Sequence, residues 1–151
     1  VGSEMCIRDS PKKKMVFNPA ESIDFHGFTG PFIQYTYARI SSILRKLNYQ
    51  SSTELLDDAN DTWLPLEKEL IVTIEQFPTV LKDAGTEQDP SKVAIYIFNL
   101  AKTFSSFYSE HSIANAESPS KQALRIMLSV FTATAIKNGM KVLGIKVPER
   151  M

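Results

Sequence analysis

Residues 90–110, PSKVAIYIFNLAKTFSSFYSE, decide the fold of this chain because they read as one long helix. Asp89 is a good N-cap, and Pro90 at the first helical position loses only an N–H that has no intrahelical acceptor. Apolar side chains then recur at steps of three and four, at Val93, Ile97, Leu100, Phe104 and Phe107. A neighbouring stripe widens the apolar face, which predicts a central helix: Ala94, Phe98, Ala101 and Tyr108.

Proline marks the start of each other helical run as well. Pro31, Pro65, Pro78 and Pro119 each precede a segment with helical apolar periodicity, such as Leu124, Leu128, Phe131, Ala135 and Met140 in the last one. Gly144 is expected to end that last helix. The polar stretch 50–62 predicts a loop. The sequence therefore predicts an all-α bundle of about five helices, at residues 31–48, 64–76, 78–85, 90–110 and 119–144.

The first thirty residues do not fit this pattern. Residues 1–10, VGSEMCIRDS, show no amphipathic period, and we expect them to be a non-native extension. Residues 11–30 are broken by proline and glycine and read as a linker or as the end of something larger. Apolar side chains there predict an exposed sticky patch, at Phe17, Ile23, Phe25 and Phe28.

The composition argues against several classes of protein. The chain of 151 residues has no apolar run long enough to span a membrane, and the single Cys6 excludes an internal disulfide and a thiolate zinc cluster. His26 and His111 lack companions at ligand spacing, so we expect no metal site. A reducing, cytoplasmic setting is the default expectation.

No catalytic constellation stands out either. The sequence has no glycine-rich phosphate loop. The carboxylates of Asp57, Asp58 and Asp61 lie in the polar stretch without a histidine partner and are read as solvated. The adjacent residues Ser109, Glu110 and His111 point in different directions on a helix, so they cannot form a triad.

Charge is unevenly distributed although the net charge is zero. Residues 32–50 carry a local charge of +3, residues 51–90 carry −8 and residues 121–151 carry +5. If the two basic segments pack side by side, they make a positive face. Scattered solvated charge is the alternative, and composition alone does not decide between the two.

Residues 30–40, GPFIQYTYARI, place aromatic and basic side chains on one helix. Phe32 and Tyr35 share a face that Arg39 extends, whereas Tyr37 points elsewhere. Such a face can stack on unpaired bases and hold phosphates. The alternative is packing in the core, which we favour for Phe32 and leave open for Tyr35.

The same region resembles a known family. Residues 27–46, GFTGPFIQYTYARISSILRK, resemble the helix that opens the C-terminal, DALR-type anticodon-binding domain of arginyl-tRNA synthetases, where Gly-Pro-x-x-Gln-Tyr-x-x-Ala-Arg recurs. Three later segments match that family in the same order, including the Glu-Arg-Met end: residues 67–78, 89–117 and 136–151. The resemblance covers about residues 11–151.

The resemblance implies a function for a larger enzyme. Class I arginyl-tRNA synthetases use ATP, with Mg, to attach arginine to tRNA-Arg. This sequence holds neither the HIGH-like nor the KMSKS-like motif of their catalytic domain, so the resemblance implies an inactive C-terminal fragment without a cofactor of its own. Residues 11–30 would end the catalytic domain, and residues 31–151 would form the bundle. The implied partners are the tRNA-Arg anticodon stem-loop and the catalytic domain in cis, with no membrane and in a monomer.

The resemblance also implies site residues. Family contacts with RNA come from the first helix, from the loop after the central helix and from the C-terminus, which here gives Tyr35, Arg39, His111, Ile113, Asn115, Arg150 and Met151. Tyr35 would stack on a base of the loop. Phe32 and Gln34 would lie at the junction with the catalytic domain. Basic residues that could contact phosphates are Arg45, Lys46, Lys137, Lys141 and Lys146.

Three other interpretations stay open. A helical protein-interaction module predicts no salt-sensitive affinity for RNA, and a complete small enzyme requires an acid–base constellation that the sequence does not offer. Related bundles occur in cysteinyl and methionyl synthetases, but the Gln-Tyr-x-x-Ala-Arg motif and the Glu-Arg-Met end argue against them.

Overall fold

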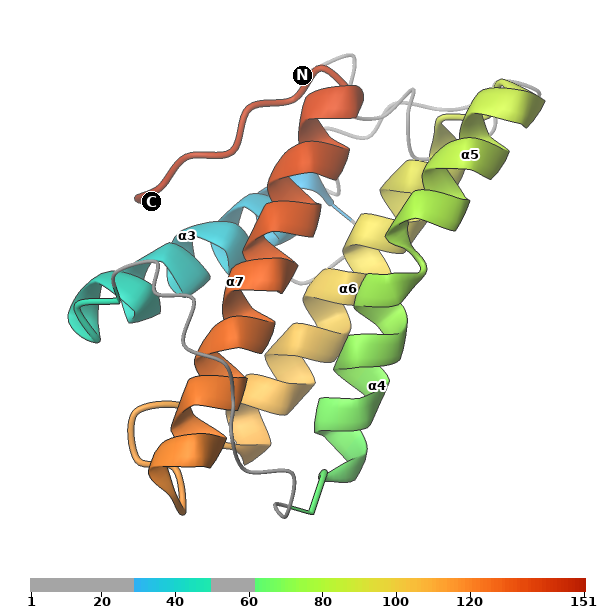
Figure 1. Cartoon of the computed structure of the whole chain (residues 1–151). Helices are drawn as coiled ribbons and strands as arrows, with labels where there is room; N and C mark the ends of the chain where they lie inside the picture. The colour runs from blue at the N-terminus through green and yellow to red at the C-terminus, as the bar shows by residue number, and fades with distance from the viewer. Residues whose placement is uncertain (1–28, 50–61) are drawn as a thin grey trace.

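A computed structural model of the chain describes residues 29–49 and 62–151. These residues form five helices, α3 (Gly30–Lys46), α4 (Pro65–Glu75), α5 (Phe77–Glu87), α6 (Ser91–Glu110) and α7 (Pro119–Val142) (Figure 1). The all-α prediction is confirmed, with every helix boundary within two residues of the predicted one. The expectations for residues 1–28, among them the extension and the apolar patch, and for the loop at 50–61 lie outside the described residues. None of the described helices is long and apolar enough to cross a membrane.

Local capping explains where the helices begin. The hydroxyl of Thr29 accepts the N–H of Phe32 at 3.3 Å, and the hydroxyl of Ser118 accepts the N–H of Lys121 at 3.0 Å. The carboxylate of Asp89 accepts the N–H of Ser91 at 3.0 Å. Each side chain satisfies a donor that the first helical turn leaves without an acceptor.

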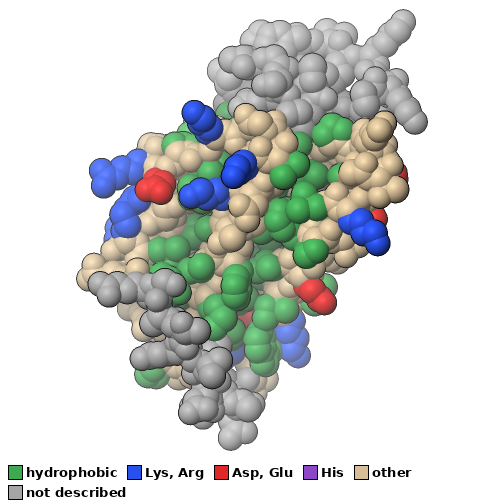
Figure 2. Space-filling view, turned by 45° about the horizontal axis from the view of Figure 1, so that its top comes forward, with side chains coloured by type: hydrophobic (Ala, Val, Ile, Leu, Met, Phe, Trp, Pro, Cys, Tyr) green, Lys and Arg blue, Asp and Glu red, His purple; other side chains and the backbone are tan. Residues whose placement is uncertain are grey.

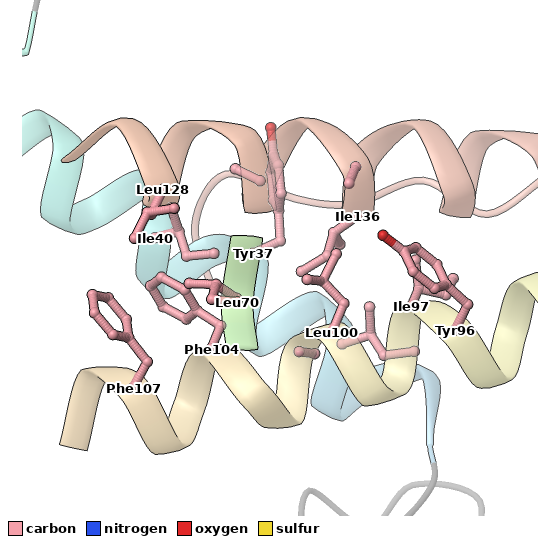
Figure 3. Packing of buried hydrophobic residues seen from close by; sticks show 14 of the residues in the cluster. Tyr37, Ile40, Leu70, Tyr96, Ile97, Leu100, Phe104, Phe107, Leu128 and Ile136 are labelled. Carbon is pink, nitrogen blue, oxygen red and sulfur yellow. The ribbon is translucent and has the colours of Figure 1, made fainter. Parts of the chain in front are cut away.

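Helix α6 lies at the centre of the bundle, as its two apolar stripes predict. It packs against α3, α4, α5 and α7 (Figure 1). Its side chains meet residues from the other helices in one core, which Figure 3 shows at Tyr37, Ile40, Leu70, Ile97, Leu100, Phe104, Leu128 and Ile136. Burying each large apolar side chain stabilises the fold by about 1.5–3 kcal/mol. This core fixes how the helices that carry the candidate site sit against one another.

Two glycines shape α7 and the turn at its C-terminal end. Gly139 lies where α7 packs closely against α6, because a Cβ there would come within 2.8 Å of Cγ2 of Ile97. Gly144 has φ +75°, a left-handed conformation that favours glycine, and ends the helix as predicted. The N–H of Ile145 donates to the carbonyl of Met140 at 2.9 Å across this turn. The turn sends the tail, residues 145–151, away from the end of α7 and across towards α3 (Figure 1).

Candidate nucleic-acid interface

The solvent face of α3 carries the first group of predicted contacts. Tyr35 is 47% exposed and Arg39, one helical turn further on, is also exposed, whereas Tyr37 lies in the core at 6%. Phe32 is partly buried, with its ring 5.4 Å from that of Phe98. The helix therefore buries Tyr37, half-buries Phe32, and leaves Tyr35 and Arg39 facing water.

A groove of about 570 Å³ separates the second half of α3 from the end of α6 and the residues after it. Arg39, Ser42 and Lys46 line its α3 side. The other side is lined by residues that are 60 or more positions later in the sequence: Tyr108, Ser109, Glu110, Ser112, Ile113 and Ala114. Two of the three predicted contact segments thus form the walls of one groove.

Tyr108 holds Arg39 in this groove, and the sequence pattern did not identify it as a site residue. The guanidinium of Arg39 lies over its ring, 4.5 Å from the centroid. Such a contact is worth about 0.5–1 kcal/mol at an exposed site, and it orients the planar cation. Tyr108 also stacks on Phe104 at 6.2 Å, and that helical spacing made it look like core alone.

The loop 111–118 follows α6 and carries the second group of predicted contacts. His111 caps α6, and its ring lies 5.8 Å from that of Phe107. Asn115 is exposed, and its backbone N–H donates to the hydroxyl of Ser112 at 3.1 Å. Ile113 is only 1% exposed and belongs to the core, and its predicted contact with RNA stays a prediction. Its side chain anchors the loop, because an apolar side chain is more stable inside the bundle than in water.

The tail forms the third group and is tied to α3. The side-chain amide of Gln34 donates to the carbonyl of Lys146 at 2.9 Å, and Arg45 Nη1 donates to the carbonyl of Glu149 at 3.3 Å. Met151 is 63% exposed at the end of this tail. The predicted role of Gln34 at a domain junction stays a prediction, but its amide already has an acceptor within the bundle.

Figure 1 places the basic and acidic helices on different sides. Helix α3 lies on the left, α6 and α7 lie in the middle, and α4 with α5 lies on the right. Helix α3 contains three basic residues and no acidic one, whereas α4 and α5 together contain five acidic and two basic residues. Lysine and arginine side chains gather on the face where the tail and the end of α7 lie, with an acidic side chain among them (Figure 2). Charge is thus unevenly distributed over the folded chain as well as along the sequence.

Two of the six basic residues in segment 121–151 do not contribute to that surface. Lys121 and Arg125 are buried against the carboxylate of Glu67, with Nζ–Oε2 at 2.7 Å and Nε–Oε1 at 3.0 Å. The N–H of Leu64 donates to the same carboxylate at 3.0 Å, and Lys121 also donates to the carbonyl of Thr62. The segment's other basic side chains are exposed: Lys137, Lys141, Lys146 and Arg150.

Glu67 stays ionised in this buried network. Burial by itself raises the pKa of a carboxyl group, but the hydrogen bonds from Lys121, the N–H of Leu64 and Arg125 outweigh it and hold the pKa of Glu67 below its usual 4.5. Sequence reasoning missed this network, since only the short spacing between Lys121 and Arg125 is visible in the sequence. Within residues 29–49 and 62–151, no three His, Cys, Asp or Glu side chains cluster as metal ligands do.

The chain is similar in sequence to known proteins. The family model of the DALR anticodon binding domain matches residues 33–151. The arginine–tRNA ligase of Flavobacterium psychrophilum is 47% identical over 145 residues, and that of Parabacteroides distasonis is 46% identical over 147. Each match covers 96% of this chain and 24% of the relative, so the chain spans about a quarter of the length of these curated relatives.

Solved structures show the same fold. The arginyl-tRNA synthetase of Thermus thermophilus matches with a TM-score of 0.82 at 28% identity, over 96% of this chain and 25% of that one. The enzyme of Plasmodium falciparum matches with a TM-score of 0.80 at 24% identity, over 99% of this chain and 26% of that one, which supports the fold alone. The family match covers every described helix except the first residues of α3. This chain belongs to the DALR anticodon binding domain family.

Proposed function

We propose that this chain binds the anticodon stem-loop of tRNA-Arg as the anticodon-recognising part of an arginine–tRNA ligase. The observation that carries the proposal is the convergence of three segments far apart in sequence: the outer face of α3, the loop 111–118 and the tail. The α3 face and the loop share one groove, and α3 holds the tail by hydrogen bonds from Gln34 and Arg45. Family membership and the names of the relatives support an RNA ligand.

Each exposed side chain has a role that its chemistry suits. Tyr35 presents a ring on which an unpaired base can stack, and such stacking is worth about 1–3 kcal/mol per base. Arg39, held flat by Tyr108, can bind a phosphate or a base edge through its planar donors. Asn115 can read a base edge, and the side chain of Met151 can lie against a base. Further positive charge for phosphates comes from Arg45, Lys46, Lys137, Lys141, Lys146 and Arg150.

The same proposal assigns chemistry to other parts of the enzyme. Attachment of arginine with ATP and Mg belongs to a catalytic domain in cis, and Phe32 with Gln34 would lie towards it. The chain described here would aminoacylate nothing alone and would act in the cytoplasm, within a monomeric enzyme.

Fluorescence anisotropy tests the proposal. The chain is titrated into a labelled tRNA-Arg anticodon stem-loop, and into a control with the same stem and a different loop, at two salt concentrations. We expect tighter binding to the native loop, with log K falling by about 0.7–0.9 per log unit of salt for each phosphate contacted. Equal affinity for both loops, or no binding with the helical CD signal intact, would contradict the proposal.

A further inference from the structure

Arg125 faces both the core and the loop. Its Nε donates to the buried Glu67, while Nη1 donates to the carbonyl of Ser112 at 2.7 Å. Its Nη2 meets the carboxylate of Glu117, with Nη2–Oε2 at 2.7 Å. The side chain of Arg125 is 1% exposed and that of Glu117 is 66% exposed. One guanidinium therefore joins a buried carboxylate of α4 to two points of the loop 111–118.

The same stretch of loop has further attachments to the bundle. The side-chain amide of Gln122, near the start of α7, donates to the carbonyl of Ala114 at 2.7 Å. Ile113 is inserted in the core, and the N–H of Asn115 is held within the loop by Ser112. These contacts determine the backbone path from residue 112 to residue 117, and they lie next to the groove that Arg39 lines.

Only arginine supplies this set of contacts. Its guanidinium spreads five N–H donors over three nitrogens in one fixed plane, whereas the three donors of an ammonium all start from a single nitrogen. Glu67 fixes the plane of that guanidinium from inside, where an unpaired charge would be costly. The direction in which Arg125 presents its outer donors is thus determined by the core and not by the loop.

We propose that Arg125 is a positioning residue for RNA recognition, which fixes residues 112–117 in the conformation that presents Asn115 to the RNA. A loop that is fixed before binding loses less conformational entropy when RNA binds. Arg125 therefore raises affinity without touching RNA. The RNA part of this inference rests on the proposed function, whereas the effect of Arg125 on the loop does not.

The test removes Glu117, the exposed partner of Arg125, and leaves the buried pair of Arg125 with Glu67 intact. Glu117→Ala deletes the acceptor, and Glu117→Gln keeps an acceptor oxygen without the charge. Glu87→Ala is the matched control, because Glu87 is an exposed glutamate that pairs with Lys92 at the end of α5, away from the loop. Amide hydrogen exchange of residues 112–117 and affinity for the tRNA-Arg stem-loop are measured for each variant.

We expect Glu117→Ala to speed exchange of the Asn115 amide by about three- to tenfold, as fits the loss of a hydrogen bond to a largely exposed carboxylate. Core amides of α6 and α7 should be unchanged, and RNA affinity should fall by about threefold or more. Removing a negative charge would by itself strengthen binding to a polyanion. Weaker binding would therefore reflect the changed conformation of the loop and not the change in charge. Glu117→Gln should recover most of both effects, and Glu87→Ala should show neither.

Other outcomes would overturn the inference. Unchanged exchange in residues 112–117 of Glu117→Ala would show that the pair of Arg125 with Glu117 does not position the loop. Faster exchange with unchanged or tighter RNA binding would show that the loop conformation does not matter for recognition. Failure of the unmutated chain to bind the stem-loop would refute the proposed function and the RNA role of Arg125 together, while the exchange data would still decide the effect on the loop.

A second variant examines the guanidinium directly. Arg125→Lys keeps the positive charge beside Glu67 but cannot reach Ser112 and Glu117 together. We expect a folded protein with fast exchange at residues 112–117 and weaker RNA binding than Glu117→Ala gives. A folded Arg125→Lys protein with the exchange pattern of the unmutated chain would contradict the proposal.

Discussion

The guanidinium of Arg39 lies 4.5 Å from the centroid of the Tyr108 ring, which joins the exposed face of α3 to the end of α6. The guanidinium of Arg39 faces the groove on one side, and the Tyr108 ring on its other side fixes its position. Mutations can separate the roles of the two residues, because Arg39 carries the charge and Tyr108 only orients it.

Arg39→Ala and Tyr108→Leu should therefore weaken RNA binding in different ways. If Arg39 contacts a phosphate, as proposed, Arg39→Ala should make the slope of log K against log salt shallower by about 0.7–0.9. Tyr108→Leu keeps the charge, so affinity should fall a few-fold with the slope unchanged. Anisotropy at four salt concentrations measures both. Identical slopes for the two variants would show that Arg39 does not contact a phosphate.

Tyr35→Ala should reduce affinity for the stem-loop by about 1–3 kcal/mol, the range found for stacking of one base. Because Tyr35 is largely at the surface, the thermal midpoint should change little. Phe131→Ala is the matched control, since Phe131 is an exposed aromatic of nearly equal exposure on α7, at 49% against 47%. Equal losses in the two variants would argue against a specific role for Tyr35.

Gly139→Ala should destabilise the bundle by about 1–3 kcal/mol, because its Cβ would come within 2.8 Å of Ile97 and overpack the α6–α7 contact. Gly85→Ala is the control, because no atom lies within 4 Å of a Cβ at that helical position. It should stabilise the protein by about 0.5–1 kcal/mol. Urea unfolding followed by CD measures both changes. A neutral Gly139→Ala would show that the two helices can separate there without cost.

Acid should destabilise the protein through Glu67. The pKa of this carboxyl is lower in the folded protein than its usual 4.5, so its contribution to stability is present above that value and is lost as pH falls below it. Glu117, whose pKa is lowered by its own backbone N–H and by Arg125, acts in the same direction.

Glu67→Gln separates this effect from general acid denaturation. At pH 7 the variant should lose about 3–5 kcal/mol, because Lys121 and Arg125 remain buried without a counter-charge. Its unfolding free energy should also depend less on pH between 3 and 5 than that of the unmutated chain. Parallel pH profiles for the two proteins would contradict the assignment of the acid transition to Glu67.

Local signals made the fold predictable from the sequence. Proline at the start of a helix, glycine after its end and apolar periodicity all lie within one element, which is why the α6 stripe and the end of α7 at Gly144 were predicted correctly. The same signals could not place the tail, because the hydrogen bond from Gln34 to Lys146 spans 112 residues.

The candidate site was less predictable. Helical spacing put Tyr35 and Arg39 on one face, but it could not decide whether that face was buried, and only packing left Tyr35 in water. The family resemblance placed Ile113 in a loop that contacts RNA, whereas its side chain is packed in the core. Glu67 and Arg125 are 58 residues apart, so no local pattern could pair them.

The most direct test of the proposed RNA-binding surface is an NMR titration of the ¹⁵N-labelled chain with the tRNA-Arg anticodon stem-loop. We expect amide shifts to change on the outer face of α3 at Tyr35, Arg39 and Lys46, in residues 111–117 and in the tail to Met151. Amides on the outer face of α4 and α5, such as those of Val72 and Lys82, should stay in place. Shift changes centred on α4 and α5, or none at saturating RNA, would contradict the proposed RNA-binding surface.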